Sequence, residues 1–249
     1  MSITINEHLT EALKKLGIAN LRLQQEAPME AILNNEDVIV LMPTSGGKSL
    51  LYQLPAVMEH GSLTLVISPL KALQLDQVES LHSKGIRAAV LNSDLSAAEH
   101  RDVLEDMTRR GGLLYLAPEQ LQNMAVADAL RTANLTRIAV DEAHTLPQAK
   151  DDFRKAYGKV GSFIHSLPHR PQVIALTATA TRNDVSRIRK SLGIPNAERF
   201  RTPLRRDNLH LCIKHIGNSK IRKGKRKPST ENVLFQSVER ELSKWDEDG

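Results

Sequence analysis

The feature that most constrains the fold of this chain is an alternation of short apolar runs with longer helical stretches between residues 38 and 182. The apolar runs are rich in valine, isoleucine and leucine, and they predict strands at residues 38–42, 63–68, 88–91, 113–117, 137–140 and 172–176. Apolar strands that are each followed by a helix indicate a parallel sheet covered on both faces. We therefore predict an α/β fold with a doubly wound parallel sheet, in which ligands bind beside the carboxyl ends of the strands.

The composition fits one large domain or two small ones. The chain has 249 residues, of which 41% are hydrophobic, so it can bury a substantial core. Its single cysteine, Cys212, cannot form an internal disulfide, and no Cys/His group has the spacing of a zinc site, which indicates a reducing compartment. Residues 1–17 combine a polar start with an amphipathic helix and lack the apolar run of a signal peptide or membrane anchor. We therefore expect a cytoplasmic protein.

The net charge of +5 is concentrated in one segment. Seven lysines and arginines lie between Lys214 and Lys227 with no acidic residue among them, so the rest of the chain has a net charge of −2. The segment also contains glycine and proline but no core-forming period, which predicts a basic linker or loop at 211–229. It would separate a main domain at 1–210 from a terminal helix at 230–249. The basic run at 220–227 either contacts phosphates or is a solvated linker.

A phosphate-binding loop is predicted where the first strand meets the next helix. The sequence there is MPTSGGKS, in which small residues allow backbone N–H groups to approach phosphate oxygens. Lys48 would reach the terminal phosphates and Ser49 would offer its hydroxyl to Mg²⁺. The predicted cofactor-binding residues of this loop are Thr44, Ser45, Gly46, Gly47, Lys48 and Ser49. Met42 stands where such loops usually begin with glycine.

Two carboxylates directly follow the predicted strand at 137–140. An Asp-Glu pair at a strand end is often only a solvated turn, but its occurrence together with the phosphate loop favours a catalytic role. We assign Asp141 to Mg²⁺ and Glu142 to the attacking water, which it would orient or deprotonate. His144, two residues further on, is a candidate for coupling this pair to the next motif.

Together these motifs resemble those of superfamily-two helicases, and most closely those of the RecQ family, over residues 16–209. The resemblance implies a RecA-like P-loop NTPase fold, with ATP and Mg²⁺ as cofactors. Upstream of the phosphate loop, LGIANLRLQQEA resembles the family's adenine-recognition motif. It implies that Arg22 packs on the base and that Gln25 reads the base edge, which an amide matches with one donor and one acceptor.

Further segments resemble the DNA-facing side of RecQ proteins, which implies single-stranded and duplex DNA as partners and a nucleoid-associated or, in a eukaryote, nuclear location. SPLKALQLDQ resembles motif Ia, LNSDLS and LLYLAPEQL resemble the stretch after it, and ALTATAT resembles motif III. Small polar and backbone groups in these segments would grip phosphates. The residues implied to bind DNA or to couple it to the ATP site are Ser68, Pro69, Lys71, Asn92, Phe153, Arg154, Thr177 and Thr179.

The chain departs from the RecQ pattern at three places. In the loop TLPQAKDDFRKAY, the positions of a tryptophan and a histidine are Ala149 and Asp151, which weakens the expected stacking on unpaired bases. The aromatic residue that commonly stacks on adenine falls at Ile18, so selectivity for adenine is expected to be looser. Ser45 replaces a glycine of the phosphate loop.

The resemblance also implies a second RecA-like lobe, for which these residues contain no sequence. Residues 232–245 resemble the helix that leads into that lobe, so we expect an excised domain or a truncated product. The leading hypothesis is the ATP-binding motor lobe of a DNA helicase with 3′-to-5′ polarity, in which hydrolysis by this piece alone is slow or absent. Two alternatives stay open: an RNA-directed DEAD/DEAH helicase lobe, and a non-catalytic module that binds DNA in response to nucleotide. The oligomeric state is left open.

Overall fold

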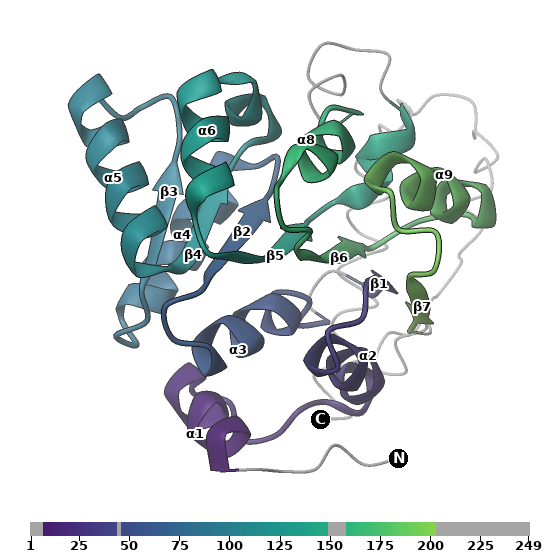
Figure 1. Ribbon diagram of the computed structural model, residues 1–249. Helices are drawn as coiled ribbons and strands as arrows, with labels where there is room; N and C mark the ends of the chain where they lie inside the picture. Colours follow the sequence, from purple (N-terminus) through teal and green to yellow (C-terminus); the bar gives the residue numbers. More distant parts are fainter. Residues whose placement is uncertain (1–6, 44–45, 149–157, 203–249) are drawn as a thin grey trace, which may run out of the picture. The chain divides into compact units, whose positions relative to one another are not determined.

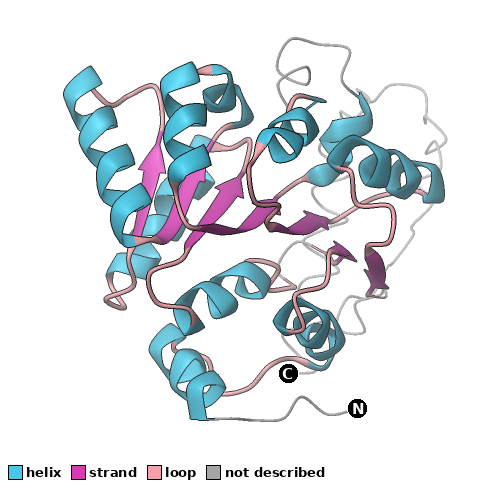
Figure 2. Ribbon diagram, in the orientation of Figure 1, coloured by secondary structure: helices cyan, strands magenta, loops and turns pink. Residues whose placement is uncertain are grey.

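The computed structural model describes residues 7–43, 46–148 and 158–202. These residues form one seven-stranded sheet with helices packed on both of its faces (Figures 1 and 2). Every neighbouring pair of strands is parallel, and the strand order is β3-β4-β2-β5-β6-β1-β7. The strands are β1 Val38–Leu41, β2 Leu63–Ile67, β3 Ala88–Leu91, β4 Gly112–Leu116, β5 Leu135–Val140, β6 Gln172–Thr177 and β7 Glu198–Arg201.

The described helices divide into two sets, one for each face of the sheet. Residues of β1 alternate between these faces, because Ile39 and Leu41 belong to one buried cluster and Val38 and Val40 to the other. One face is covered by α1 Glu7–Leu16, α2 Leu23–Leu33, α3 Leu50–Met58 and α4 Lys71–His82. The other is covered by α5 Ala97–Arg110, α6 Met124–Thr132, α8 Val160–Ser166 and α9 Arg182–Leu192, with the 3₁₀ turns η1 Pro118–Gln122 and η2 Ala143–Gln148 nearby.

The doubly wound parallel sheet predicted from the sequence is confirmed, and all six predicted strands are present with ends that shift by at most a few residues. Strand β7 was not predicted, and its residues Glu-Arg-Phe-Arg are exposed apart from the half-buried Phe200. An edge strand of this kind lacks the apolar signal that marked the others. Among the described helices, none is long and apolar enough to cross a lipid bilayer. The predicted linker at 211–229 and helix at 230–249 lie outside the described residues.

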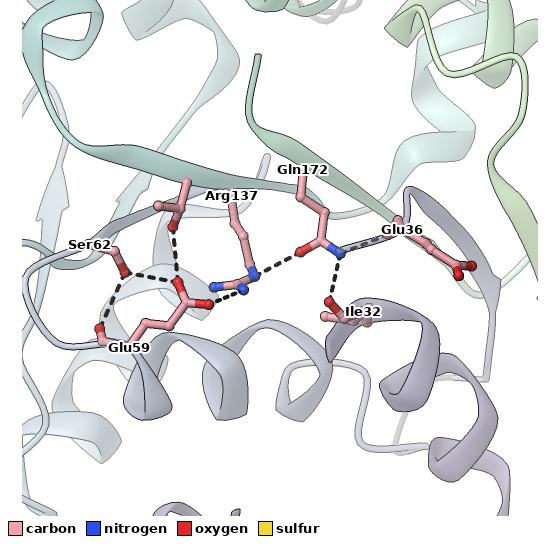
Figure 3. A network of polar contacts seen from close by, with 7 residues as sticks. Ile32, Glu36, Glu59, Ser62, Arg137 and Gln172 are labelled. Carbon is pink, nitrogen blue, oxygen red and sulfur yellow. Dashed lines mark hydrogen bonds and ion pairs between the residues drawn. The ribbon is translucent and has the colours of Figure 1, made fainter. Parts of the chain in front are cut away.

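A polar network links four elements near the amino ends of the central strands (Figure 3). Arg137 of β5 is only 5% exposed, and its guanidinium binds Glu59 at the end of α3 and donates from Nε to Gln172 Oε1 at 2.7 Å. The amide of Gln172 then donates to the carbonyl oxygens of Ile32 at 2.8 Å and Glu36 at 2.7 Å. A buried arginine is tolerated only when its charge is matched, so Glu59 balances the charge while Gln172 holds α2 to the sheet.

The Glu59 carboxyl responds to two opposing effects. Burial alone would raise its pKa, but the hydrogen bond and positive charge of Arg137 outweigh burial and hold the pKa below its usual value. A carboxyl with a lowered pKa stabilises the fold above its unfolded pKa of about 4.3, and this stability is lost as pH falls through the folded pKa.

We predict that Glu59→Gln lowers the free energy of unfolding by about 1 kcal/mol at pH 7, a modest loss because the Glu59 side chain is 42% exposed and screened by water. Urea denaturation at pH 7 and at pH 3 would measure the difference, which should shrink at the lower pH. Glu36→Gln, which removes a carboxylate from an exposed side chain, is the control. An equal loss at both pH values would contradict the ionic role of Glu59.

Candidate nucleotide and metal site

The parallel sheet brings the predicted motifs to one edge. The phosphate loop follows β1, the acidic pair follows β5, and Ser68 follows β2, so all of them lie at carboxyl ends of strands. Lys48 and Ser49 line the same cavity, of about 270 Å³, as Asp141 and Glu142. Residues far apart in the sequence therefore line one cavity.

Close contacts surround both glycines of the phosphate loop, and the backbone conformation of Gly47 itself favours glycine. Gly47 has a φ of +80°, and a Cβ atom added there would lie 2.4 Å from Gln25 Nε2. A Cβ atom added to Gly46 would lie 2.4 Å from the side chain of Met42. The Lys48 ammonium lies back over the loop and donates to the Met42 carbonyl at 3.4 Å. Thr44 and Ser45 lie outside the described residues.

The side chain of Gln25, predicted to read adenine, is hydrogen-bonded to the phosphate loop. The side chain is 2% exposed, its Oε1 accepts from the Arg22 backbone N–H at 2.8 Å, and its Nε2 donates to the Gly47 carbonyl at 3.0 Å. The amide therefore connects the start of α2 to the phosphate loop. Arg22 lies directly before α2, at its N-cap position. The sequence indicates Gln25 but not this contact, because local patterns do not encode a hydrogen bond between residues 22 positions apart.

The acidic pair lies at a strained turn. Glu142 has a φ of +50°, which is rare for a residue with a side chain and is found most often at functional sites. Burial, and next the charge of Glu142, raise the pKa of Asp141 above its usual value. A cation held between Asp141 and the Ser49 hydroxyl would relieve this cost, and oxygen donors of these two kinds suit Mg²⁺.

His144 connects the acidic pair to the end of β6. Its Nδ1 lies 3.0 Å from Thr177 Oγ1 and 3.1 Å from Glu142 Oε2. The Thr177 hydroxyl donates its one hydrogen to the Thr179 carbonyl at 3.0 Å, so it can only accept from His144. Nδ1 therefore carries the hydrogen that Thr177 Oγ1 accepts, and the Glu142 carboxylate lies within ion-pair distance of the same nitrogen.

The predicted DNA-facing residues fall into two groups. Lys71 and Asn92 are brought together by Asp94, whose carboxylate binds Lys71 Nζ at 2.8 Å and whose backbone N–H donates to Asn92 Oδ1 at 2.9 Å. Ser93 completes this group with its hydroxyl 2.6 Å from Lys71 Nζ. Ser68 and Pro69 form the loop between β2 and α4 beside it, whereas Thr177 and Thr179 lie at the end of β6. Phe153 and Arg154 lie outside the described residues.

Two tyrosines beside the site were not predicted from the sequence. Tyr52 of α3 and Tyr115 of β4 are 3% and 1% exposed, and both line the cavity that holds Ser49 and Asp141. The signal that could have found them is their position inside otherwise apolar segments, since a buried phenol requires a hydrogen-bond partner.

The fold and the loop after β1 define an α/β domain of the P-loop NTPase class. A family model described as DEAD/DEAH box helicase matches residues 22–188. The chain belongs to this family, and the resemblance to RecQ helicases predicted from the motifs is confirmed.

Two curated relatives match this chain over more than four-fifths of its length. A protein of Bacillus subtilis, described as the probable ATP-dependent DNA helicase RecS, is 38% identical over 204 residues, which is 82% of this chain and 40% of the relative. The ATP-dependent DNA helicase RecQ of Synechocystis is 39% identical over 217 residues, or 84% of this chain and 45% of the relative. The chain thus spans less than half the length of these relatives.

Solved structures agree on the fold. The helicase MrfA bound to DNA superposes with a TM-score of 0.65 at 21% identity, covering 81% of this chain and 30% of that one. The helicase domain of Pyrococcus furiosus Hef gives a TM-score of 0.58 at 22% identity, with 73% and 38% covered. At such identities these matches speak for the architecture alone.

We predict that Asp141→Asn raises the free energy of unfolding at pH 7 by on the order of 1 kcal/mol in metal-free buffer, because it removes a buried charge that Glu142 repels. A raised folded pKa costs stability only where the group ionises, so the gain should disappear below the unfolded aspartate pKa of about 3.9. Urea denaturation at pH 7 and pH 3.5 measures the gain in stability and its disappearance at the lower pH. If Asp141→Asn is less stable than the parent at pH 7, the buried charge of Asp141 does not cost the fold stability.

Proposed function

We propose that this chain is the ATP-binding motor lobe of a RecQ-like DNA helicase, which couples ATP hydrolysis to 3′-to-5′ translocation and unwinding. The observation that carries the proposal is the shared cavity of Lys48, Ser49, Asp141 and Glu142 at the carboxyl edge of the sheet. Family membership supports the same assignment, as do the curated relatives, which are described as ATP-dependent DNA helicases.

The proposed roles follow from the positions of the side chains. The backbone around Gly46 and Gly47, with Thr44 and Ser45, would cradle the ATP phosphates while Lys48 turns from the Met42 carbonyl toward them. Ser49 and Asp141 would hold Mg²⁺, which supplies charge neutralisation of the phosphate oxygens when bound. Glu142 would orient and deprotonate the attacking water, and His144 would hold Glu142 through Nδ1.

Adenine recognition is proposed for Arg22 and Gln25. Since the Gln25 amide bonds Arg22 and Gly47, reading a base edge would require it to exchange at least one of these contacts. Base binding and the position of the phosphate loop would then be linked through one side chain.

The DNA-binding surface is proposed to include Ser68, Pro69, Lys71, Asn92, Phe153, Arg154, Thr177 and Thr179. Its support is the group around Lys71 beside the loop after β2, together with the bond between His144 and Thr177 that joins the end of β6 to the acidic pair. The second lobe is expected to supply arginines to the transition state, a contribution worth roughly 10³-fold or more in rate, so this chain alone should hydrolyse ATP slowly.

We predict that Lys48→Ala weakens binding of Mg·ATP at least about ten-fold, because it removes the cation that reaches the terminal phosphates. Glu142→Gln should bind nucleotide like the parent but lose hydrolysis, because an amide cannot accept the proton of water. Equilibrium binding of a fluorescent ATP analogue and steady-state phosphate release measure the two effects. Turnover by Glu142→Gln equal to that of the parent would remove Glu142 from the catalytic role.

The first measurement compares Mg·ATP hydrolysis without nucleic acid, with single-stranded DNA and with single-stranded RNA. Stimulation by DNA alone is the expected pattern for a RecQ-like lobe, and stimulation by RNA would favour the RNA-directed alternative. Nucleotide-dependent DNA affinity without any turnover would favour the non-catalytic module.

We predict that Asp94→Asn tightens binding of single-stranded DNA about three- to ten-fold. The Asp94 carboxylate holds Lys71 in the way that a phosphate oxygen would, and the hydrogen bond from Lys71 keeps the pKa of Asp94 below its usual value, so the pair persists at neutral pH. Freeing Lys71 should also steepen the salt dependence by up to about 0.7 in log–log slope. Fluorescence anisotropy at several salt concentrations measures both effects.

Asp102→Asn is the charge-matched control for Asp94→Asn, since it removes an exposed aspartate from α5. If both variants tighten binding equally, the effect is one of net charge, and Lys71 is not the group released.

A further inference from the structure

The buried face of α4 contains a glutamine among apolar residues. Its buried residues are Gln74, Val78 and Leu81, which lie on one side of the helix. Gln74 is 1% exposed, so its amide is as far removed from water as the apolar side chains that follow it. An amide buried without hydrogen-bond partners costs free energy, so the contacts of Gln74 should explain why this position is polar.

Only the nitrogen end of this amide has a partner. Gln74 Nε2 donates to the Ser68 carbonyl oxygen at 2.7 Å, which ties α4 to the loop after β2. A carbonyl oxygen can only accept, so this bond determines which end of the amide is nitrogen. The other end, Oε1, is buried and has no hydrogen-bond partner among the residues that the structure describes. Gln74 thus holds one acceptor in reserve.

The same side chain lines the proposed nucleotide and metal cavity. Gln74 shares this cavity, of about 270 Å³, with Lys48, Ser49, Asp141 and Glu142. The serine hydroxyl and the two carboxylates are oxygen donors of the kind that Mg²⁺ prefers. An unmet acceptor therefore belongs to a residue that lines a cavity whose chemistry fits a metal ion.

The ligands proposed for this cavity bring few hydrogen-bond donors. The phosphate oxygens of ATP are acceptors, and so are the ionised carboxylates of Asp141 and Glu142. Lys48 is assigned to the phosphates. Mg²⁺ that is held by one or two protein oxygens and by phosphates usually keeps several water molecules, whose hydrogens point away from the ion. Water on the metal is thus the donor that best matches the free Oε1.

A neutral amide suits this position better than a carboxylate does. Burial, and next the charge of Glu142, already raise the pKa of Asp141 above its usual value. A third negative charge would add to this repulsion, whereas an amide oxygen can orient a water molecule without adding charge.

We propose that Gln74 is a positioning residue for the metal–nucleotide complex, with Oε1 accepting a hydrogen bond from a water molecule on Mg²⁺ while Nε2 holds the loop after β2. This inference rests on the proposed function, because it assumes that Mg·ATP binds the phosphate loop. Groups that act on a metal site from outside the ligand shell commonly contribute about ten-fold or more to metal affinity.

Titration with Mg²⁺ of the full chain and a fluorescent, non-hydrolysable ATP analogue tests the proposal. Gln74→Met keeps an unbranched side chain but removes the amide, so the half-saturating Mg²⁺ concentration should rise about ten-fold. Affinity for the analogue in EDTA should equal that of the parent, because no metal-bound water is then present. Direct binding of Mn²⁺ in the presence of the analogue, followed by electron paramagnetic resonance, should show the same loss.

Gln74→Glu separates the two ends of the amide. It keeps an acceptor but loses the donor to the Ser68 carbonyl, so it should bind the metal at least as tightly as the parent does. If the bond to Ser68 were the group that matters, Gln74→Glu and Gln74→Met would lose metal affinity equally. Gln74→Leu replaces Gln74→Met if the latter does not fold.

Thr64→Val is the matched control. It also removes a buried polar group that has no hydrogen-bond partner in the described part of the chain, but from near the amino end of β2, whereas the cavity lies at the carboxyl ends of the strands. Its Mg²⁺ dependence should equal that of the parent.

The outcomes distinguish this inference from the proposed function. An unchanged Mg²⁺ dependence in Gln74→Met, an equal loss in Gln74→Glu, or an equal loss in Thr64→Val overturns the role of Gln74 while leaving nucleotide binding intact. A loss of affinity in Gln74→Met that is as large in EDTA as in Mg²⁺ also overturns it. Absence of Mg²⁺-dependent binding of the analogue by the parent refutes the proposed function itself.

Discussion

The parallel pairing of the central strands is the constraint on which the site depends. In register, β1 pairs with β6 and β6 with β5, so the phosphate loop, the motif around Thr177 and the acidic pair emerge side by side at one edge. An antiparallel neighbour would send one of these segments to the opposite edge. Because the residues of β1, β5 and β6 are buried on both faces, apart from the partly buried Thr136, packing fixes the register of these strands, and the loops can carry strained or polar residues without loss of the fold.

The two ends of the same sheet therefore differ in their polar chemistry. At the amino ends, Arg137, Glu59 and Gln172 match charge to charge and hold α2 and α3 to the strands. At the carboxyl ends, Glu142 adopts a left-handed backbone and Asp141 has a raised pKa, both of which cost stability. The paired charges and the strained, ligand-facing groups of the described residues therefore lie at opposite ends of the strands.

The strands and the candidate site residues could be predicted from the sequence. The contacts that these residues make within the protein could not. Apolar runs revealed six strands because each is buried, whereas the exposed β7 carried no such signal. Local motifs located Lys48, Asp141 and Glu142, because phosphate loops and acidic strand ends have fixed short-range chemistry. The hydrogen bonds from Gln25 to Gly47 and from Gln53 to Tyr115 join residues distant in sequence, so they depend on helix packing that local patterns do not encode.

These unpredicted contacts also change how the predicted residues are understood. Gln25 holds the phosphate loop, Asp94 holds Lys71, and Thr177 holds His144, so each expected ligand-binding group already has a partner inside the protein. A ligand that binds such a group must displace the group's partner inside the protein. It can favour the new arrangement only to the extent that it binds that arrangement more tightly than the original one. Under the proposed function, exchange of partners at Gln25 and Lys71 would link the binding of nucleotide and of DNA to the start of α2 and the start of α4. A site whose groups had no partner inside the protein could bind a ligand without such a link.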